Sequence, residues 1–294
     1  MVHLPKEALP YAEPLVSIYL PTHNRPHLLK RALKSLISQT YANIQIIVIA
    51  DSCYFETHEL LESFAGIDNR VEWYSVDFKS PAKTRNFAIS RATGKFITGV
   101  DDDDYFANDH IAYLCNLFLS LKDCPFLYFD HIELQSNRRK RVKKDSILTI
   151  KKLYAFNIPG NQIFTHTRKL QEIGGFDVSM KGWEDYDLWL RFSLRFGCGL
   201  HSSNPSYFMD TTHDSQRITK SSLNEIGALQ FYHKHRKNMN LTVQMLHELE
   251  IAYLSGDSFK PKYLYSFLSP YNIYALKLFL KLFLKNFLSI EFQF

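Results

Sequence analysis

Short apolar runs alternate with segments of helical periodicity over residues 15–100. The runs are rich in β-branched and aromatic residues, which is typical of buried strands. Apolar residues also recur at helical spacing, as Leu29, Leu33 and Leu36 do. We expect strands over 15–20, 44–50, 71–76 and 95–100, and helices over 27–39, 56–65 and 81–92. This alternation predicts right-handed βαβ units and a mostly parallel, Rossmann-like sheet flanked by helices.

Carboxylates follow two of the expected strands. Asp51 comes directly after the strand 44–50, and Asp101–Asp104 follow the strand 95–100. In an open α/β sheet, ligands bind beyond the carboxyl ends of the strands. The sequence therefore predicts a polar binding site at this edge of the sheet.

The alternation loosens after residue 105. We expect strands or extended segments over 126–134, 162–166 and 200–210, a helix over 182–197, and a polar loop over 213–221. From Ser221 to Phe294 the chain is expected to be helical. Because no repeat or low-complexity linker divides the sequence, we expect an α/β body over 1–220 and a C-terminal helical extension over 221–294.

The composition excludes several classes of protein. With 46% hydrophobic and 22% charged residues, the chain is neither a disordered tail nor a fibre. The net charge of +5 is mild, and the recognition motifs of nucleic-acid binders are missing. The cysteines form no CxxC pair and are expected to be reduced. Because we find neither a signal peptide nor an apolar run long enough to span a membrane, we expect a cytoplasmic protein.

The segment VDDDDYF (100–106) is the strongest chemical signal. Adjacent carboxylates repel one another unless a cation or bound donors offset their charge. If the segment is extended, Asp101 and Asp103 share one side, and Asp102 and Asp104 share the other. A hard divalent ion such as Mg²⁺ or Mn²⁺ would suit them, with phosphate oxygens and water as further ligands. The alternative is a solvated acidic turn in which Asp104 caps the next helix.

Four segments together resemble the family-2 glycosyltransferases, a large inverting family that uses nucleotide-diphosphate sugars and has the GT-A fold. The segments are VSIYLPTHNRPHLLKRALKSLISQTY (16–41), IIVIADSC (46–53), AKTRNFAISRATGKFITGVDDDDYF (82–106) and IGGFDVSMKGWEDYDLWLRF (173–192). Each is a weak signal alone, but their order and spacing across residues 15–215 are specific. The resemblance implies an α/β GT-A fold followed by the C-terminal helices.

The resemblance also implies the donor and metal contacts. The DxD motif of the family corresponds to Asp101, Asp102 and Asp103. Since the last carboxylate is the usual metal contact, Asp103 is the first expected ligand of Mn²⁺ or Mg²⁺, and Asp101 is the second. The expected contacts to the nucleotide, which the family's habit suggests is UDP, are Pro21, Thr22, Asn24, Arg25, Asp51, Arg85, Asp101 and Asp102.

One position departs from the family pattern. The family usually carries two adjacent acids after the second strand, and this chain has Ala50 and then Asp51. Asp51 occupies the place of the acid that bonds the pyrimidine base, so base recognition is expected without the first carboxylate. Asn86, next to Arg85, is expected to be structural.

The segment WEDYDLW (183–189) separates its acids if it is helical. Asp185 begins an inward stripe that continues through Leu188 and Trp189. Asp187 lies on another face, four residues before Arg191, where an exposed ion pair is expected.

This segment matches the ED motif of the family, which implies that Asp185 is the catalytic base. Glu184 is the alternative candidate for this role. A helix N-terminus favours an ionised carboxylate, and a base must be deprotonated. The alternative is that both acids merely begin a helix.

Three further segments bear on function. Related enzymes often place in the loop 213–221 a residue that closes over the metal or diphosphate, so His213 and Arg217 are candidates. The basic run 138–144 is expected to be a solvated loop, either near an anionic lipid or acceptor or without a role.

Within 271–290, Lys277, Lys281 and Lys285 form one basic stripe of an otherwise apolar helix, which suits a membrane surface. Packing on the protein or a dimer contact are the alternatives.

These observations predict a metal-dependent, inverting glycosyltransferase of the hexosyltransferase type. It would transfer sugar from a UDP-sugar to a glycan or lipid-linked acceptor in lipopolysaccharide, O-antigen or capsule biosynthesis, at the inner face of the cell membrane. The alternatives are a non-catalytic nucleotide-sugar binder or scaffold, and a nucleotidyltransferase. A nucleotidyltransferase normally has a Gly-rich, basic loop after the first strand, and PTHNRP (21–26) is not such a loop.

Overall fold

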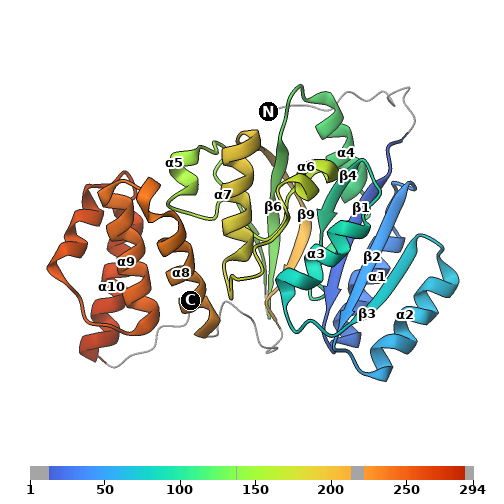
Figure 1. The fold of residues 1–294 in the computed structure, drawn as a ribbon, viewed down its shortest axis with the longest axis horizontal. Coiled ribbons are helices and arrows are strands. Elements are labelled where there is room, and N and C mark those ends of the chain that lie inside the picture. Colours follow the sequence, from blue (N-terminus) through green and yellow to red (C-terminus); the bar gives the residue numbers. More distant parts are fainter. Residues whose placement is uncertain (1–12, 137, 213–221, 289–294) are drawn as a thin grey trace.

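One sheet, with the order β3-β2-β1-β4-β8-β6-β9-β5, runs through the α/β part of the computed structural model (Figure 1). The structure describes residues 13–136, 138–212 and 222–288. Its strands are β1 (Val16–Thr22), β2 (Ile44–Asp51), β3 (Val71–Val76), β4 (Phe96–Gly99), β5 (Tyr105–Phe106), β6 (Phe126–Gln135), β7 (Arg138–Val142), β8 (Phe164–His166) and β9 (Leu200–Asp210). β1 pairs in parallel with β2 and β4, and β2 with β3, as the alternating sequence predicts.

The rest of the sheet is mixed. β8 runs antiparallel to β4 and β6, β6 runs parallel to β9, and β5 is antiparallel to β9. β4 and β6 therefore point the same way, and both end at the edge where β1 and β2 end. The α/β fold with a mostly parallel sheet that the sequence predicts is confirmed.

Helices cover both faces of the sheet. α1 (Pro26–Ile37), α2 (Phe55–Ile67) and α4 (His110–Ser120) share a core with one face, and α3 (Pro81–Arg91), α6 (Thr167–Glu172) and α7 (Glu184–Phe196) with the other. In β2, Ile46 and Val48 belong to the first core, and Ile47 and Ile49 to the second. The unbroken apolar run of this strand is thus explained by burial on both sides.

The chain after the sheet is helical. A short helix, α5 (Ile150–Leu153), precedes α7, and the C-terminal elements are α8 (Ser222–His235), η2 (Arg236–Asn238), α9 (Leu241–Ser255), η3 (Pro261–Leu268) and α10 (Asn272–Leu288). They gather at the end of the molecule opposite α2 and β3, with α7 between them and the sheet (Figure 1).

The C-terminal helices pack against α7 and against each other. The ring of Phe231 in α8 stacks on Tyr186 of α7, with centroids 3.9 Å apart. α10 buries Ala275, Leu278 and Leu282 against the rest of the protein. The packing alternative for the segment 271–290 therefore holds for this inner face of α10.

Two expectations from the sequence are wrong. The basic run 138–144 is largely a strand, because 138–142 pairs with β6 as β7, although Arg138–Arg141 are exposed as expected. Asp187 is fully buried rather than exposed.

Asp187 is the anchor between α7 and α8. Its carboxylate binds Arg191 Nε at 2.7 Å on its own helix, and His235 Nε2 and Lys234 Nζ, both at 2.8 Å, on α8. Burial alone would raise the pKa of Asp187, but the bond from His235 and the charges of Arg191 and Lys234 outweigh it, and the pKa is lowered. The ionised carboxylate therefore holds the first C-terminal helix to the α/β body.

We predict that Asp187→Ala lowers the free energy of unfolding by about 3–5 kcal/mol, because the partners of a buried charge lose their counter-ion. The matched control is Glu172→Ala, which removes an exposed pair with Arg195 and is expected to cost less than about 1 kcal/mol. Chemical denaturation of both variants measures the difference, and equal small effects would contradict the anchoring role.

Candidate functional site

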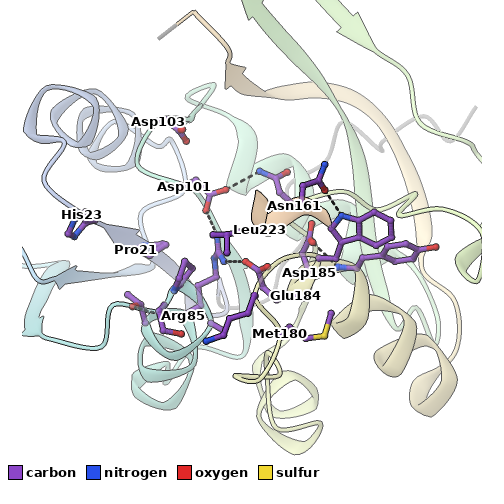
Figure 2. Close-up of a pocket in the computed structure, with 18 of the residues that line it drawn as sticks. Pro21, His23, Arg85, Asp101, Asp103, Asn161, Met180, Glu184, Asp185 and Leu223 are labelled. Carbon is purple, nitrogen blue, oxygen red and sulfur yellow. Dashed lines mark hydrogen bonds and ion pairs between the residues drawn. The ribbon is translucent and has the colours of Figure 1, made fainter. Parts of the chain in front are cut away.

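A cavity of about 1340 Å³ opens at the carboxyl ends of β1, β2 and β4 (Figure 2). Its lining comes from Pro21–Arg25, Asp51, Asp101–Asp104, the start of α7 at Trp183–Tyr186, and the C-terminal residues Leu223, Asn224, Glu250 and Tyr274. The acidic segment and the ED motif, far apart in sequence, thus line one cavity.

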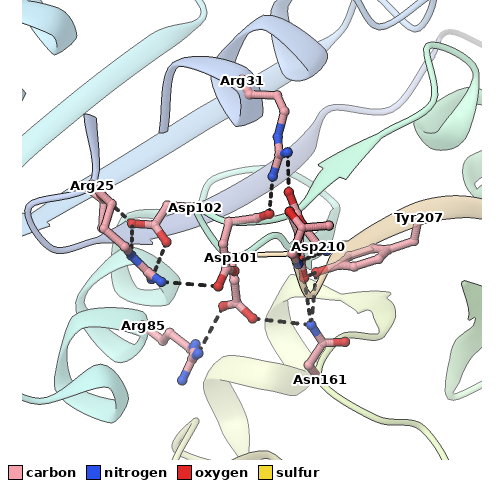
Figure 3. Close-up of polar contacts among 12 residues, drawn as sticks. Arg25, Arg31, Arg85, Asp101, Asp102, Asn161, Tyr207 and Asp210 are labelled. Carbon is pink, nitrogen blue, oxygen red and sulfur yellow. Dashed lines mark hydrogen bonds and ion pairs between the residues drawn. The ribbon is translucent and has the colours of Figure 1, made fainter. Parts of the chain in front are cut away.

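The acidic segment is a turn and not an extended strand. The Asp104 amide donates to the Asp101 carbonyl at 3.0 Å, so the four side chains fan outward instead of alternating. The expected pairing of Asp101 with Asp103 and of Asp102 with Asp104 is wrong. The carboxylates instead bind side chains from other elements, and Arg25 and Asn161 each contact two of them (Figure 3).

Asp102 and Asp103 face the turn after β1. Thr22 Oγ1 donates to Asp102 Oδ2 at 2.7 Å, and Arg25 forms an ion pair with the same carboxylate. Arg25 Nη1 also lies 3.2 Å from Asp103 Oδ2. Burial raises the pKa of Asp102 to about 6 despite the Arg25 charge. Thr22 and Arg25 therefore hold the acidic turn in place, whatever they contribute to nucleotide binding.

Asp104 points away toward β9. Its carboxylate accepts bonds from the Tyr207 hydroxyl at 2.6 Å and from the Asp210 amide at 3.0 Å. Burial, followed by the charges of Asp103 and Asp101, raises its pKa. Asp104 thus joins the acidic turn to β9 and is a structural member of the cluster.

Arg85 connects the two ends of the cavity. Its Nη2 lies 3.0 Å from Asp101 Oδ1, and its Nη1 lies 2.9 Å from Glu184 Oε1. Asn161 donates a further bond to Asp101 at 3.3 Å. Burial alone would raise the pKa of Asp101, but the charge and hydrogen bond of Arg85, the Asn161 bond and the Arg25 charge together outweigh it, and the pKa is lowered. The side chain predicted to touch a nucleotide therefore bridges the acidic turn to the start of α7.

Asp185 has a different environment from its neighbour Glu184. Its carboxylate accepts bonds from Asn157 Nδ2 at 2.9 Å and from the Tyr186 amide at 2.8 Å, and no ion pair reaches it within the described ranges. Burial, and then the charge of Glu184, raises the pKa of Asp185 to about 6. Burial thus outweighs the expected effect of the helix N-terminus and leaves a carboxylate that exchanges protons near neutrality.

Asp51 also lines the cavity, with both oxygens engaged. Oδ1 accepts bonds from the amides of Phe78 and Lys79 at 2.7 and 2.9 Å, and Oδ2 from Thr84 Oγ1 at 2.7 Å. Although burial opposes it, these bonds lower the pKa of Asp51. Its visible role is to tie β2 to the loop before α3, and contact with a base stays a prediction.

The remaining nucleotide candidates form the turn after β1. Asn24 has a left-handed backbone, with φ 50°, and its side chain bonds the Ser52 carbonyl at 3.1 Å and the Tyr54 amide at 2.7 Å. Pro21 lines the cavity beside it. Asn86 pairs with the backbone of Phe176 and is structural, as expected. His213 and Arg217 lie outside the described residues.

Several residues that line the cavity are not predicted from the sequence. Asn157 and Asn161 come from the irregular loop before β8, and Glu250 and Tyr274 from helices without any recognisable motif. Only the folded chain brings these residues to the ED motif. In the described part of the chain, no three side chains of the kinds that bind metals converge on one point.

The comparisons with known proteins agree with this architecture. Residues 17–176 match the model of the family described as Glycosyl transferase family 2. The putative colanic acid biosynthesis glycosyl transferase WcaA of Escherichia coli (strain K12) is 31% identical over 230 residues, which cover 76% of this chain and 82% of WcaA.

Two solved structures share the fold at low sequence identity. S. aureus TarS 1-349 in complex with UDP-GlcNAc has a TM-score of 0.59 at 15% identity, covering 95% of this chain and 93% of that one. The mannosyltransferase PcManGT from Pyrobaculum calidifontis, in complex with GDP-Man and Mn²⁺, has a TM-score of 0.57 at 14% identity, covering 97% and 92%. With the family match and the relative above, these findings show that the chain belongs to glycosyltransferase family 2.

Proposed function

We propose that this glycosyltransferase transfers a sugar, with inversion, from a UDP-sugar to a hydroxyl of a glycan or lipid-linked acceptor during the assembly of a bacterial surface polysaccharide. One observation carries the proposal. Asp185, a half-buried carboxylate without a cationic partner in the described residues, shares a cavity with the acidic turn Asp101–Asp104. One cavity is therefore lined by a carboxylate that can take a proton from an acceptor hydroxyl and by a cluster of carboxylates that can hold a cation.

The chemistry follows from the two environments. Asp185 takes the proton of the acceptor hydroxyl, whose oxygen attacks the anomeric carbon while the bond to the nucleotide diphosphate breaks and its electron pair leaves with the diphosphate. Arg85 holds Glu184 in an ion pair, so Asp185 is the neighbouring acid that is left to act as base. A single displacement inverts the configuration at the anomeric carbon.

A divalent cation fits the acidic turn as a donor-binding group. Asp103 lines the cavity with a side chain that is 13% exposed, and Asp101 lines the same cavity. Hard cations such as Mn²⁺ and Mg²⁺ take one or two carboxylates together with phosphate oxygens and water, so three converging side chains are not required. When bound, such an ion would offset the charge that builds on the departing diphosphate.

The relatives support the class of substrate. WcaA is named for the biosynthesis of colanic acid, and the two similar structures hold UDP-GlcNAc in one case and GDP-Man with Mn²⁺ in the other. UDP is the nucleotide we propose, because Asp51 occupies the position of the family acid that bonds a pyrimidine.

We further propose that the C-terminal helices rest on an anionic membrane surface. On the outer side of α10, Ile273 is 71% exposed, and Leu276 and Leu280 follow it at helical spacing. Leu268 at the end of η3 is 74% exposed, and Lys277 lies exposed beside the apolar stripe. An apolar stripe flanked by basic residues suits the boundary of an anionic bilayer.

This contact would be peripheral. None of the helices in the described residues combines the length and apolar character needed to cross a bilayer. Of the expected basic stripe, Lys281 lies over the ring of Tyr253 at 5.5 Å, and the side chain of Lys285 is outside the described part.

Asp185→Asn is predicted to lower sugar transfer by about 10²–10⁴-fold, the usual contribution of a general base, while nucleotide-sugar binding persists. The rate of the unmodified enzyme should fall about tenfold per pH unit below about pH 6, because the raised pKa of Asp185 places its protonation there. Transfer rates and calorimetric donor titrations measure both effects.

Asp177→Asn is the control for this substitution, because Asp177 pairs with Lys234 outside the cavity. Transfer that survives Asp185→Asn would show that the base is wrongly assigned. Donor binding without any transfer by the unmodified protein would favour the scaffold alternative.

Removal of divalent ions with a chelator is predicted to abolish transfer, and Mn²⁺ or Mg²⁺ should restore it. Asp103→Ala should lower the rate about 100-fold or more, since several kcal/mol of charge stabilisation depend on the ion. Asp109→Ala, an acid outside the cavity lining just before α4, is the control. Full activity in the presence of chelator would contradict the metal assignment.

The variant Leu268→Ser/Ile273→Ser is predicted to release the protein from vesicles that contain phosphatidylglycerol. Co-sedimentation measures it, and phosphatidylcholine vesicles without anionic lipid should bind little of the unmodified protein. Tyr54→Ser/Phe55→Ser is the control, because these residues are 76% and 73% exposed at the opposite end of the molecule. Equal sedimentation of all three proteins would rule out this surface.

A further inference from the structure

The C-terminal helices contribute to the lining of the cavity, and we call the part that they line the chamber. Its residues include Glu250 of α9 and Tyr274 of α10, together with Tyr186 of α7, which follows the proposed base Asp185 in sequence. The family match ends at residue 176, so α9 and α10 lie outside the residues that the family model matches.

Two polar groups in this chamber form fewer hydrogen bonds than they can. Glu250 accepts one hydrogen bond, from the Tyr274 hydroxyl at 3.0 Å, and is otherwise unpaired among the described side chains. Tyr186 is 4% exposed, and its buried hydroxyl has no hydrogen-bond partner in the described part of the chain. A buried hydroxyl without a partner costs free energy, so its retention points to a ligand that completes the bond.

Both groups belong to the lining of the same cavity. Burial raises the pKa of the Tyr186 hydroxyl, and the next cause is the charge of Glu250. Burial also raises the pKa of Glu250 to about 7, which the Tyr274 bond and the charge of Lys281 oppose only in part.

Aromatic rings complete the chamber. Phe156 meets the rings of Tyr271 and Tyr274 edge-on, at 4.8 and 4.9 Å between centroids. Trp183 lies on the other side, 5.5 Å from Tyr186. Aromatic faces together with a few convergent polar groups suit the apolar faces and hydroxyls of a sugar ring.

The charged residues that line the chamber limit the chemical class of its ligand further. Asp185, Glu184 and Glu250 all line the cavity with carboxylates. Such a lining disfavours a phosphate or a uronic acid, and we take a neutral sugar as the ligand class.

We propose that Glu250 and Tyr186 form the subsite for a neutral sugar ring of the acceptor, with the carboxylate accepting from one ring hydroxyl and the tyrosine hydroxyl pairing with another. The proposal rests on the proposed transfer reaction, because the acceptor must approach Asp185 from the side opposite the acidic turn. The C-terminal extension would then select the acceptor, while the α/β body binds the donor.

The test measures binding of methyl glucoside, methyl galactoside, methyl mannoside and methyl glucuronide by NMR titration, in the presence of UDP and Mn²⁺. At least one neutral glycoside should bind, and Glu250→Gln and Tyr186→Phe should each weaken it about tenfold, the value of one well-placed hydrogen bond. Glu248→Gln is the matched control, because that side chain bonds Tyr232 and Lys262 away from the cavity.

Tyr186→Phe also separates binding from folding. Because the hydroxyl has no partner among the described residues, its removal should leave the melting temperature unchanged or raised, whereas a structural role would lower it. Glycoside binding that neither substitution weakens, a preference for the glucuronide, or no glycoside binding at all would overturn the subsite. Hydrolysis of UDP-sugars by the same preparation tests the proposed function separately.

Discussion

The site depends on the bridge that Arg85 makes between Asp101 and Glu184. The acidic turn follows β4 and the two acids begin α7, so both groups would repel each other across the cavity without a cation between them. One buried guanidinium satisfies both, with oxygens at 3.0 and 2.9 Å. The bridge also gives the two neighbouring acids of α7 different roles, because Arg85 holds Glu184 in an ion pair while burial, and then the charge of Glu184, raises the pKa of Asp185.

Sequence patterns are informative where a local rule determines the structure. The apolar runs and helical spacing of residues 15–100 predict the parallel strands β1–β4 and helices α1–α3, and these form as expected. Carboxyl ends of parallel strands meet at one edge, so the shared location of Asp51 and Asp101–Asp104 follows from the order of strands and helices along the chain. Asp185 and Trp189 fall on the inward side of α7, as the helical period indicates.

The wrong predictions share one physical cause, which is that a side chain's partners come from distant segments. Sequence spacing predicts an exposed Asp187 because only Arg191 is near in the chain, but α8 folds over it with Lys234 and His235. The acidic segment turns instead of extending, and its carboxylates pair in different directions with side chains from other strands and loops, which are Thr22, Arg25 and Tyr207. No local rule assigns Glu250 to the cavity, since its place depends on how α9 packs.

The C-terminal helices supply part of the lining of the functional cavity. α8 is fixed to α7 through Asp187. α9 packs against α8, and α10 packs against α9, so that Glu250 and Tyr274 line the cavity that contains Asp185. In the proposed reaction, donor and acceptor surfaces therefore come from different parts of the chain: the α/β body supplies the donor surface, and the C-terminal helices supply part of the acceptor surface. Such a division lets the acceptor change without altering the donor site.

In a single displacement promoted by Asp185, the acceptor oxygen and the departing diphosphate lie on opposite faces of the transferred sugar. The anomeric configuration of the product, read by NMR from the proton coupling at the new linkage, tests this arrangement directly. With an α-linked UDP-hexose as donor, we expect a β-linked product. An α-linked product would mean that the configuration is retained, and a single displacement promoted by Asp185 would then be excluded.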